Sequence, residues 1–151
     1  MALAFKGLIF FATEIIKEAP KCKQRMRDLN TNCDYVSIAH LNIRSLVSKF
    51  QRFNELFNKV NVDVFAITET WLNSQVPDEI LYIPGYNLIR NDRLSRGGGV
   101  AFYIRNNISF KIVNMSQNNE QLWINFSIHK RKHCVGVIYR PAQSNISCFL
   151  E

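Results

Sequence analysis

The stretch that decides the fold is YVSIAHLNIRSLVSKFQRFNELFNKVNVDVFAIT, residues 35–68. Residues 35–41 alternate apolar and polar side chains, which is typical of a half-buried strand. From Leu46 to Val60 the apolar residues recur at spacings of three and four, which predicts a helix over about 45–60 with one apolar face. Residues 63–68 are a short apolar run, which predicts a buried strand. The stretch therefore predicts a strand–helix–strand unit with parallel strands and a right-handed connection.

Short apolar runs separated by turn residues follow this unit. They predict strands at 86–90, 100–104, 108–113, 121–128 and 133–139. Their regular spacing indicates an antiparallel meander attached to the strand–helix–strand start. The predicted class is α/β (α+β) with a mostly antiparallel sheet.

The first 34 residues have a different texture and stay unassigned. The apolar run at 7–13 predicts an amphipathic helix over about 4–18, closed by Pro20, and the polar residues 19–34 resemble a linker. That run is much shorter than the roughly 20 residues of a transmembrane helix. Four widely spaced cysteines, without the paired spacing of zinc sites, indicate reduced thiols in an intracellular protein. We therefore divide the chain into residues 1–34 and a domain over 35–151.

The positive charge is concentrated in the second part of the chain. The 151 residues carry a net charge of +7, and their 47% hydrophobic content excludes a disordered tail. Residues 93–151 hold 8 basic and 2 acidic side chains, a net of +6, which leaves +1 for residues 1–92. A basic half favours a polyanionic partner such as nucleic acid. A solvated basic surface explains the charge equally well.

Polar side chains stand where three of the predicted strands end. Asn42 and Glu69 follow the two parallel strands, whose carboxyl ends meet at one edge of a sheet. Their oxygens can hold Mg²⁺ there, although a lone Glu at such a place is more often only hydrogen-bonded. Tyr139 and Arg140 end the last strand and can bind a phosphate or simply close the sheet. The glycines at 97–99 lack the Lys-Ser/Thr of a P-loop, so we interpret them as permissive backbone.

Five motifs in order carry a resemblance to a known family. They are HLNIRSL at 40–46, ITETWL at 67–72, IPGYN at 83–87, Arg93 with RGGGVAFYI at 96–104, and VIYRP at 137–141. Over about 36–151 the chain resembles the endonuclease/exonuclease/phosphatase superfamily. Within it, the match is closest to the apurinic-type endonuclease domain of non-LTR (LINE-like, jockey/CR1-type) retrotransposons.

This resemblance implies a fold and an activity. The fold would be the N-terminal half of a four-layer α/β/β/α sandwich of the DNase I-like type. The activity would be Mg²⁺- or Mn²⁺-dependent cleavage of a DNA phosphodiester, which nicks target DNA for reverse transcription. Glu69 would bind the metal, Asn42 would organise metal and phosphate, and Tyr139 would contact the scissile phosphate or support the nucleophile. The residues implied in phosphate and DNA binding are Arg140, Arg96 and Arg44.

The sequence also departs from the family. The family's later Gly-Asp-x-Asn motif and Asp-His pair are not found, and no Asp follows Asp92. We therefore expect a partial domain, inactive alone, whose partners are DNA and a missing C-terminal half or a reverse transcriptase domain of a longer nuclear protein. We also expect apolar side chains of strands 100–104, 121–128 and 133–139 to face water. The alternatives are a non-catalytic remnant or nucleic-acid-binding module and, less favoured, a phosphatase of the same superfamily.

Overall fold

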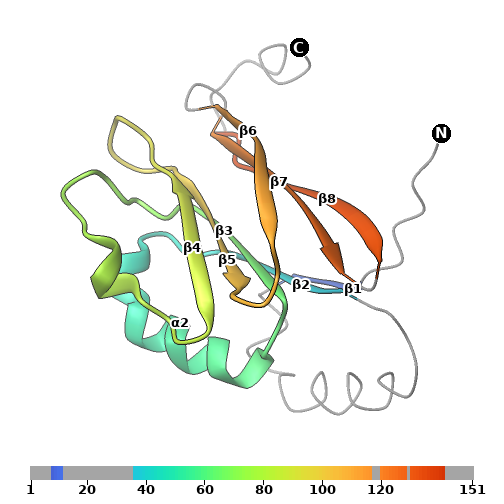
Figure 1. Ribbon diagram of the computed structural model, residues 1–151. Helices are drawn as coiled ribbons and strands as arrows, with labels where there is room; N and C mark the ends of the chain where they lie inside the picture. Colours follow the sequence, from blue (N-terminus) through green and yellow to red (C-terminus); the bar gives the residue numbers. More distant parts are fainter. Residues whose placement is uncertain (1–7, 12–35, 117–119, 129, 142–151) are drawn as a thin grey trace.

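The computed structural model describes residues 8–11, 36–116, 120–128 and 130–141 and arranges them in three layers (Figure 1). One sheet has five strands in the order β1-β2-β3-β5-β4, and the other has three in the order β6-β7-β8. The elements are β1 (Leu8–Phe11), β2 (Ser37–Asn42), α2 (Leu46–Val60), β3 (Val64–Thr68), the 3₁₀ helix η1 (Asp78–Leu81), β4 (Tyr86–Asn91), β5 (Val100–Arg105), β6 (Phe110–Ser116), β7 (Gln121–Ile128) and β8 (Arg131–Ile138).

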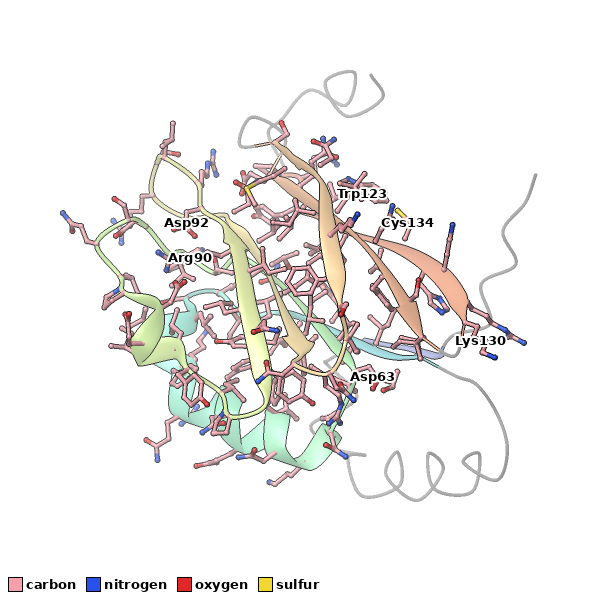
Figure 2. The ribbon with its side chains drawn as sticks, viewed as in Figure 1. Asp63, Arg90, Asp92, Trp123, Lys130 and Cys134 are labelled. Carbon is pink, nitrogen blue, oxygen red and sulfur yellow. The ribbon has the colours of Figure 1, made fainter. Side chains whose placement is uncertain are left out.

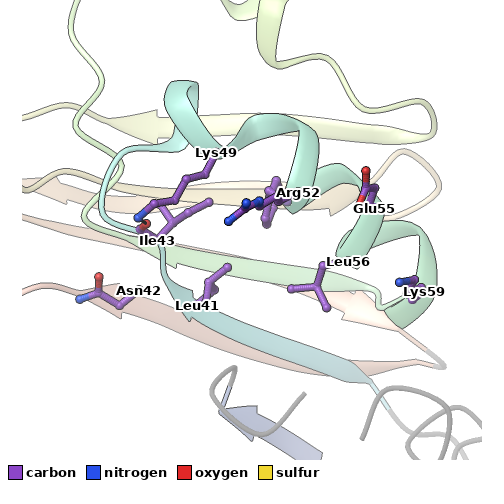
Figure 3. Close-up of a pocket in the computed structure, with 9 residues that line it drawn as sticks. Leu41, Asn42, Ile43, Lys49, Arg52, Glu55, Leu56 and Lys59 are labelled. Carbon is purple, nitrogen blue, oxygen red and sulfur yellow. Dashed lines mark hydrogen bonds between the residues drawn. The ribbon is translucent and has the colours of Figure 1, made fainter. Parts of the chain in front are cut away.

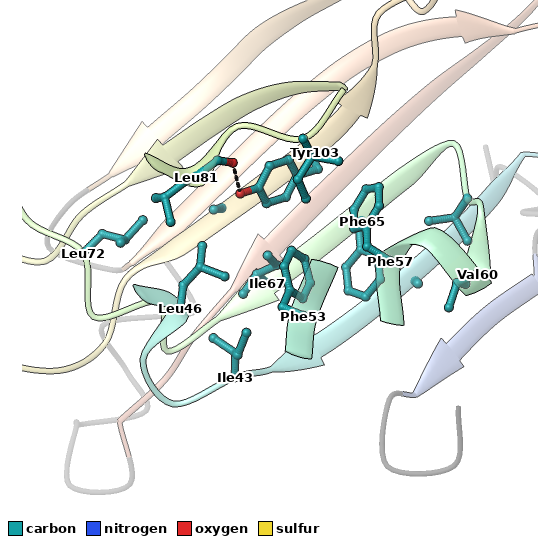
Figure 4. Packing of buried hydrophobic residues seen from close by; sticks show 14 residues of the cluster. Ile43, Leu46, Phe53, Phe57, Val60, Phe65, Ile67, Leu72, Leu81 and Tyr103 are labelled. Atoms are coloured by element: carbon teal, nitrogen blue, oxygen red, sulfur yellow. Dashed lines mark hydrogen bonds between the residues drawn. The ribbon is translucent and has the colours of Figure 1, made fainter. Parts of the chain in front are cut away.

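The strand–helix–strand unit is confirmed. Strands β2 and β3 are parallel, with Asn42 opposite Thr68 at their carboxyl ends. Helix α2 joins them and lays its apolar side on one face of the sheet, where its phenylalanines meet aromatic rings of β3 and β5 (Figure 4). The Phe53 ring lies 5.2 Å from that of Phe65 and 5.6 Å from that of Tyr103. The apolar residues that recur every three or four positions in the sequence therefore form the buried face of α2.

A second core lies between the two sheets. Val100, Phe102 and Ile104 point away from α2 and pack with inward-facing residues of the other sheet, which are Leu122, Ile124, Phe126 and Val137. The expectation that strands 100–104, 121–128 and 133–139 leave their apolar side chains in water is therefore wrong for most of them. Each sheet shields the apolar side chains of the other from water. Ile138 is an exception, because it lies on the outward face of β8 and is 47% exposed.

The strand connections differ from a simple meander. Strand β5 inserts between β3 and β4 and is antiparallel to both, and β6 begins a separate antiparallel sheet. Four of the six strand pairings are antiparallel, as predicted, and only the β1–β2 and β2–β3 pairs are parallel within the described residues. Local patterns predict where strands lie but not which strands pair, because pairing depends on burial across the whole sheet.

The N-terminal prediction needs a correction. The sequence predicts a helix over about 4–18. In the structure, Leu8–Phe11 of this segment form β1, which pairs parallel with β2. A run of Leu, Ile and two Phe has high strand propensity, and an open edge of β2 gives it a partner. The other residues of the predicted helix and linker lie outside those that the structure describes, so the division at residue 34 stays a prediction. Among the described residues, no helix is long and apolar enough to cross a membrane.

The inter-sheet core gives the first testable prediction. Leu122 is fully buried between the sheets, so L122A should lower the free energy of unfolding by about 3 kcal/mol through lost burial and a residual cavity. I80A, at a side chain that is 50% exposed, should change it by less than about 0.5 kcal/mol. Urea unfolding of the full chain measures both, and equal losses in the two variants would contradict the packing of the sheets.

Candidate functional site

The carboxyl ends of β2 and β3 bring two predicted site residues together. Asn42 is the last residue of β2 and Glu69 follows β3. The Nδ2 of Asn42 donates a hydrogen bond to Oε1 of Glu69 at 3.1 Å. Because the Asn42 amide donates through nitrogen, its oxygen stays available to a ligand beside the carboxylate. The parallel register predicted this contact.

Two aromatic side chains also act on Glu69. Tyr139, from the end of β8, and Trp71 lie close enough to its carboxylate to lower its pKa, and the Nε of Arg44 lies 3.8 Å from its Oε2. Burial raises the pKa of Glu69, but the hydrogen bonds from Asn42, Tyr139 and Trp71 and the charge of Arg44 outweigh burial, so the pKa lies below its ordinary value. Burial and the hydrogen bond to Glu69 raise the pKa of Tyr139. At neutral pH the site therefore holds a carboxylate and a protonated phenol.

The backbone at this edge adopts an uncommon conformation. Arg44, Ser45, Glu69 and Trp71 have φ of 48°, 81°, 55° and 55°, a left-handed region that costs a residue with a Cβ about 1–2 kcal/mol. Such conformations persist where surrounding contacts fix them, and they gather at functional sites. Because these residues lie at the carboxyl ends of β2 and β3, this edge of the sheet is the candidate functional site.

The Glu69-Thr70-Trp71 segment is held from two sides by backbone hydrogen bonds. On one side, the Ser45 and Leu46 amides at the start of α2 donate to the carbonyls of Glu69 and Thr70, at 2.9 and 2.8 Å. On the other side, the Thr70 amide donates to Gly99 and the Trp71 amide to Gly98, at 3.3 and 2.9 Å. The helix start and the glycine loop together fix the direction of the Glu69 side chain.

The glycines at 97–99 have the permissive role that the sequence predicts. Their φ angles are all positive. A Cβ at Gly98 would stand 2.2 Å from Oε2 of Glu120, and one at Gly99 would stand 2.5 Å from Oγ1 of Thr70. The loop therefore needs glycine for close approach as well as for backbone conformation.

Sequence reasoning missed Glu120. Its side chain is buried, and its Oε2 accepts from the Gly99 amide at 2.6 Å while its Oε1 lies 3.5 Å from Nε of Arg93. Its backbone carbonyl accepts from the Tyr139 amide at 3.1 Å. Glu120 thus connects the glycine loop of one sheet with the tyrosine of the other. In the sequence it is a lone acid ahead of a predicted strand, and only the three-dimensional pairing reveals its burial.

The predicted basic residues are divided between the two ends of the molecule. Arg44 contacts Glu69, and Arg96 and Arg140 are exposed at the same edge. Arg105 instead pairs with Asp63, at 3.3 Å, at the opposite end of β3 and β5, and Lys130 lies at the turn between β7 and β8 (Figure 2). The excess charge of residues 93–151 is therefore not one continuous DNA-facing surface.

A metal would find oxygen ligands but no full cage. The described residues hold no group of three or more His, Cys, Asp or Glu that could bind a metal ion. Glu69 and the oxygen of Asn42 can fill two positions, and Mg²⁺ usually keeps several waters and substrate phosphates besides one or two carboxylates. The donor set therefore fits a magnesium site that is completed by water and phosphate. His40 faces Thr68 at 3.2 Å instead.

A separate cavity of about 470 Å³ lies between α2 and β2 (Figure 3). Its lining includes Asn42 but neither Glu69 nor Tyr139. Lys49 of α2 reaches back from it and donates to the carbonyls of Ile43 and Arg44, which fixes the turn between β2 and α2. The cavity therefore adjoins the site at Asn42, but Glu69 does not line it.

A model of the Endonuclease/Exonuclease/phosphatase family matches residues 28–141. No curated protein matches the chain.

Solved structures match the chain over part of their length. The human Nocturnin catalytic domain with bound sulfate is 15% identical, with a TM-score of 0.50, over 72% of this chain and 51% of that one. A 3′ phosphatase, NExo from Neisseria, bound to product DNA hairpin, and an AP endonuclease from Archaeoglobus fulgidus are each 17% identical over 64% of this chain, with a TM-score of 0.44. This chain covers 39% and 38% of theirs. The chain therefore spans at most about half of these proteins, and the Nocturnin match supports a DNase I-like fold.

The glycine loop gives a second prediction. G98A and G85A both place a Cβ on a backbone with positive φ, but nothing lies within 4 Å of the Cβ at 85. Both variants should lose about 1 kcal/mol of stability from the left-handed conformation, and G98A should lose about 2 kcal/mol more by collision with Glu120. Urea unfolding measures the difference, and equal losses would show that the loop does not press against Glu120.

The carboxylate gives a third prediction. The lowered pKa of Glu69 means that its ionised form stabilises the fold above the ordinary Glu pKa, and that this contribution is lost as the pH falls through the lowered value. Y139F removes one donor, so the pKa of Glu69 should rise toward its ordinary value. A ¹³C NMR titration of the Glu69 carboxyl measures this, and an unchanged midpoint would show that Tyr139 does not donate to it.

Proposed function

The chain belongs to the endonuclease/exonuclease/phosphatase family, and on that premise we propose that it carries the metal-binding part of a divalent-metal-dependent DNA endonuclease of the non-LTR retrotransposon type. One observation carries this proposal. The Glu69 carboxylate accepts a hydrogen bond from Asn42 at 3.1 Å, and Tyr139 and Trp71 lower its pKa, at the edge where the two sheets meet.

Glu69 and Asn42 would hold Mg²⁺ or Mn²⁺ through oxygen. A bound divalent ion supplies positive charge that offsets the charge developing on a phosphate under attack. The chain's own contribution is preorganisation, because the hydrogen bonds around Glu69 fix its direction before any ligand arrives. The lowered pKa of Glu69 keeps it ionised at neutral pH, as a metal ligand must be.

Tyr139 would act as a donor. Its raised pKa keeps the phenol protonated at neutral pH, so it can donate to Glu69 or to a phosphate oxygen, and it does not act as a base. Arg44, Arg96 and Arg140 would supply positive charge along the same edge for the DNA backbone. Arg44 lies against Glu69, and a bound metal would take over part of its role as counter-ion.

The retrotransposon assignment rests on motif form. The ETWL at 69–72 and GGGVA at 97–101 resemble the retrotransposon branch more than the DNA-repair or lipid-phosphatase branches. The family's Asp and His beyond the tyrosine have no counterpart in this sequence, so nicking would require a C-terminal half or a longer parent protein that carries a reverse transcriptase. Such a protein would act on DNA in the nucleus.

A second candidate is a nucleic-acid-binding remnant without catalysis. The observation in its favour is that the side chains of Arg96 and Arg140 are exposed at the same edge as Glu69. Its exposed arginines would then bind DNA through phosphate contacts alone.

Nicking of supercoiled plasmid with Mg²⁺ tests the proposal. We expect little nicking by the chain alone and clear nicking when the C-terminal half of a retrotransposon endonuclease is supplied. E69Q should abolish the restored nicking, because a metal ligand is lost, whereas E79Q, at an exposed glutamate of η1, should preserve it.

Two outcomes would contradict the proposal. Restored nicking that E69Q leaves intact would exclude Glu69 as the metal ligand. Salt-sensitive DNA binding with no nicking under any supplementation would favour the binding remnant.

A further inference from the structure

Arg93 is a further arginine close to the candidate site. It follows β4 and leads into the glycine loop, and its side chain is 36% exposed. Its Nε lies 3.5 Å from Oε1 of Glu120, whose side chain is only 5% exposed. One nitrogen of the guanidinium thus faces a buried carboxylate, and the remaining N–H groups of its planar fork are left for another partner.

Glu120 cannot easily move away from this position. Its other oxygen accepts from the Gly99 amide at 2.6 Å, and its carboxylate fills the space where a Cβ at Gly98 would stand. The Cδ of Arg93 lies only 2.8 Å from that same Cβ position, so the arginine stem lies over Gly98. The carboxylate that Arg93 faces is therefore fixed by the glycine loop.

Contacts of Glu120 connect Arg93 with the site. The Oε1 of Glu120 lies 3.5 Å from Nε of Arg93, and the carbonyl of Glu120 accepts from the Tyr139 amide at 3.1 Å. The charge of Arg93 also lowers the pKa of the Tyr139 phenol, against the larger effects of burial and Glu69. Glu120 therefore contacts both Arg93 and Tyr139, the tyrosine that acts on the candidate metal ligand. By contrast, Arg44 has a side chain that is 74% exposed.

We propose that Arg93 contacts a phosphate of the nucleic acid strand bound at Glu69, and that Glu120 is the positioning residue that holds it there. The inference rests on the proposed function and adds a phosphate-binding residue to it. An arginine fork fixed at Nε presents its outer N–H groups to a phosphate at little entropic cost. The buried carboxylate also explains why the loop carries glycine at 98, since any side chain there would displace the anchor.

DNA affinity of the full chain tests this, measured by fluorescence anisotropy with a labelled duplex at fixed salt. R93Q should weaken binding by about tenfold or more, because a directed phosphate contact is lost. R131Q is the matched control, since it makes the same charge change at an exposed arginine by the β7–β8 hairpin, and it should weaken binding by about twofold at most.

The E120Q variant distinguishes two effects of Glu120 on DNA binding, namely its positioning of Arg93 and its negative charge. Removal of a negative charge should tighten DNA binding if only net charge matters. We expect the opposite, a loss of about threefold or more, because Arg93 is no longer held. R93K provides a second arm that keeps the charge, and it should also weaken binding, because a lysine has no Nε–H to pair with Glu120 and no planar fork.

Several outcomes would overturn the inference. These are equal effects of R93Q and R131Q, tighter binding by E120Q, or no measurable DNA binding by the chain. Circular dichroism establishes that each variant is folded. If E120Q is not folded, R93K decides, and unchanged affinity there overturns the inference. Failure of the proposed function is read separately, because it appears as nicking that E69Q does not abolish, whereas this test reads affinity.

Discussion

The Ser45 and Leu46 amides donate hydrogen bonds to the carbonyls of Glu69 and Thr70, and the rest of the site depends on these two bonds. The first amides of a helix have no partners within it, and α2 has no side-chain cap. The segment that carries the carboxylate supplies acceptors to the helix start. The same contact therefore completes α2 and holds Glu69 in its left-handed conformation. The glycine loop closes the segment from the other side, where side chains would not fit.

The site belongs to both sheets, so it exists only when they pack together. Asn42 and Glu69 come from the five-stranded sheet, and Tyr139 comes from the end of β8 in the other. Two buried polar residues connect the sheets at this edge. Asn91 donates to the carbonyls of Ser116 and Gln121, at 2.8 and 3.0 Å, and Glu120 accepts from the glycine loop. Because buried polar groups are costly when unpaired, these contacts fix one register between the sheets.

The sequence predicts the parts of this account that depend on local periodicity. The helix over 46–60, its two parallel strands and the meeting of Asn42 with Glu69 follow from spacing and from the geometry of parallel strands. The place of Tyr139 came from a family resemblance, since no local pattern relates it to Glu69. Periodicity does not encode contacts between residues that are distant in the sequence. Three features depend on such contacts, namely the pairing of β5 with β3, the second sheet and the burial of Glu120. Arg93 belongs to one of the family motifs, but the sequence does not show that it faces the buried carboxylate of Glu120.

We propose that this edge is a preorganised metal and phosphate site shared by two sheets. The left-handed residues gather at the edge where Asn42 and Glu69 meet, and such conformations are common at functional sites. A crystal of the full chain soaked in Mn²⁺ and measured at the manganese absorption edge tests this most directly. We expect an anomalous peak bonded to the Glu69 carboxylate and the Asn42 oxygen, with Tyr139 beside it. A peak elsewhere, or a Tyr139 hydroxyl turned away from Glu69, would contradict it.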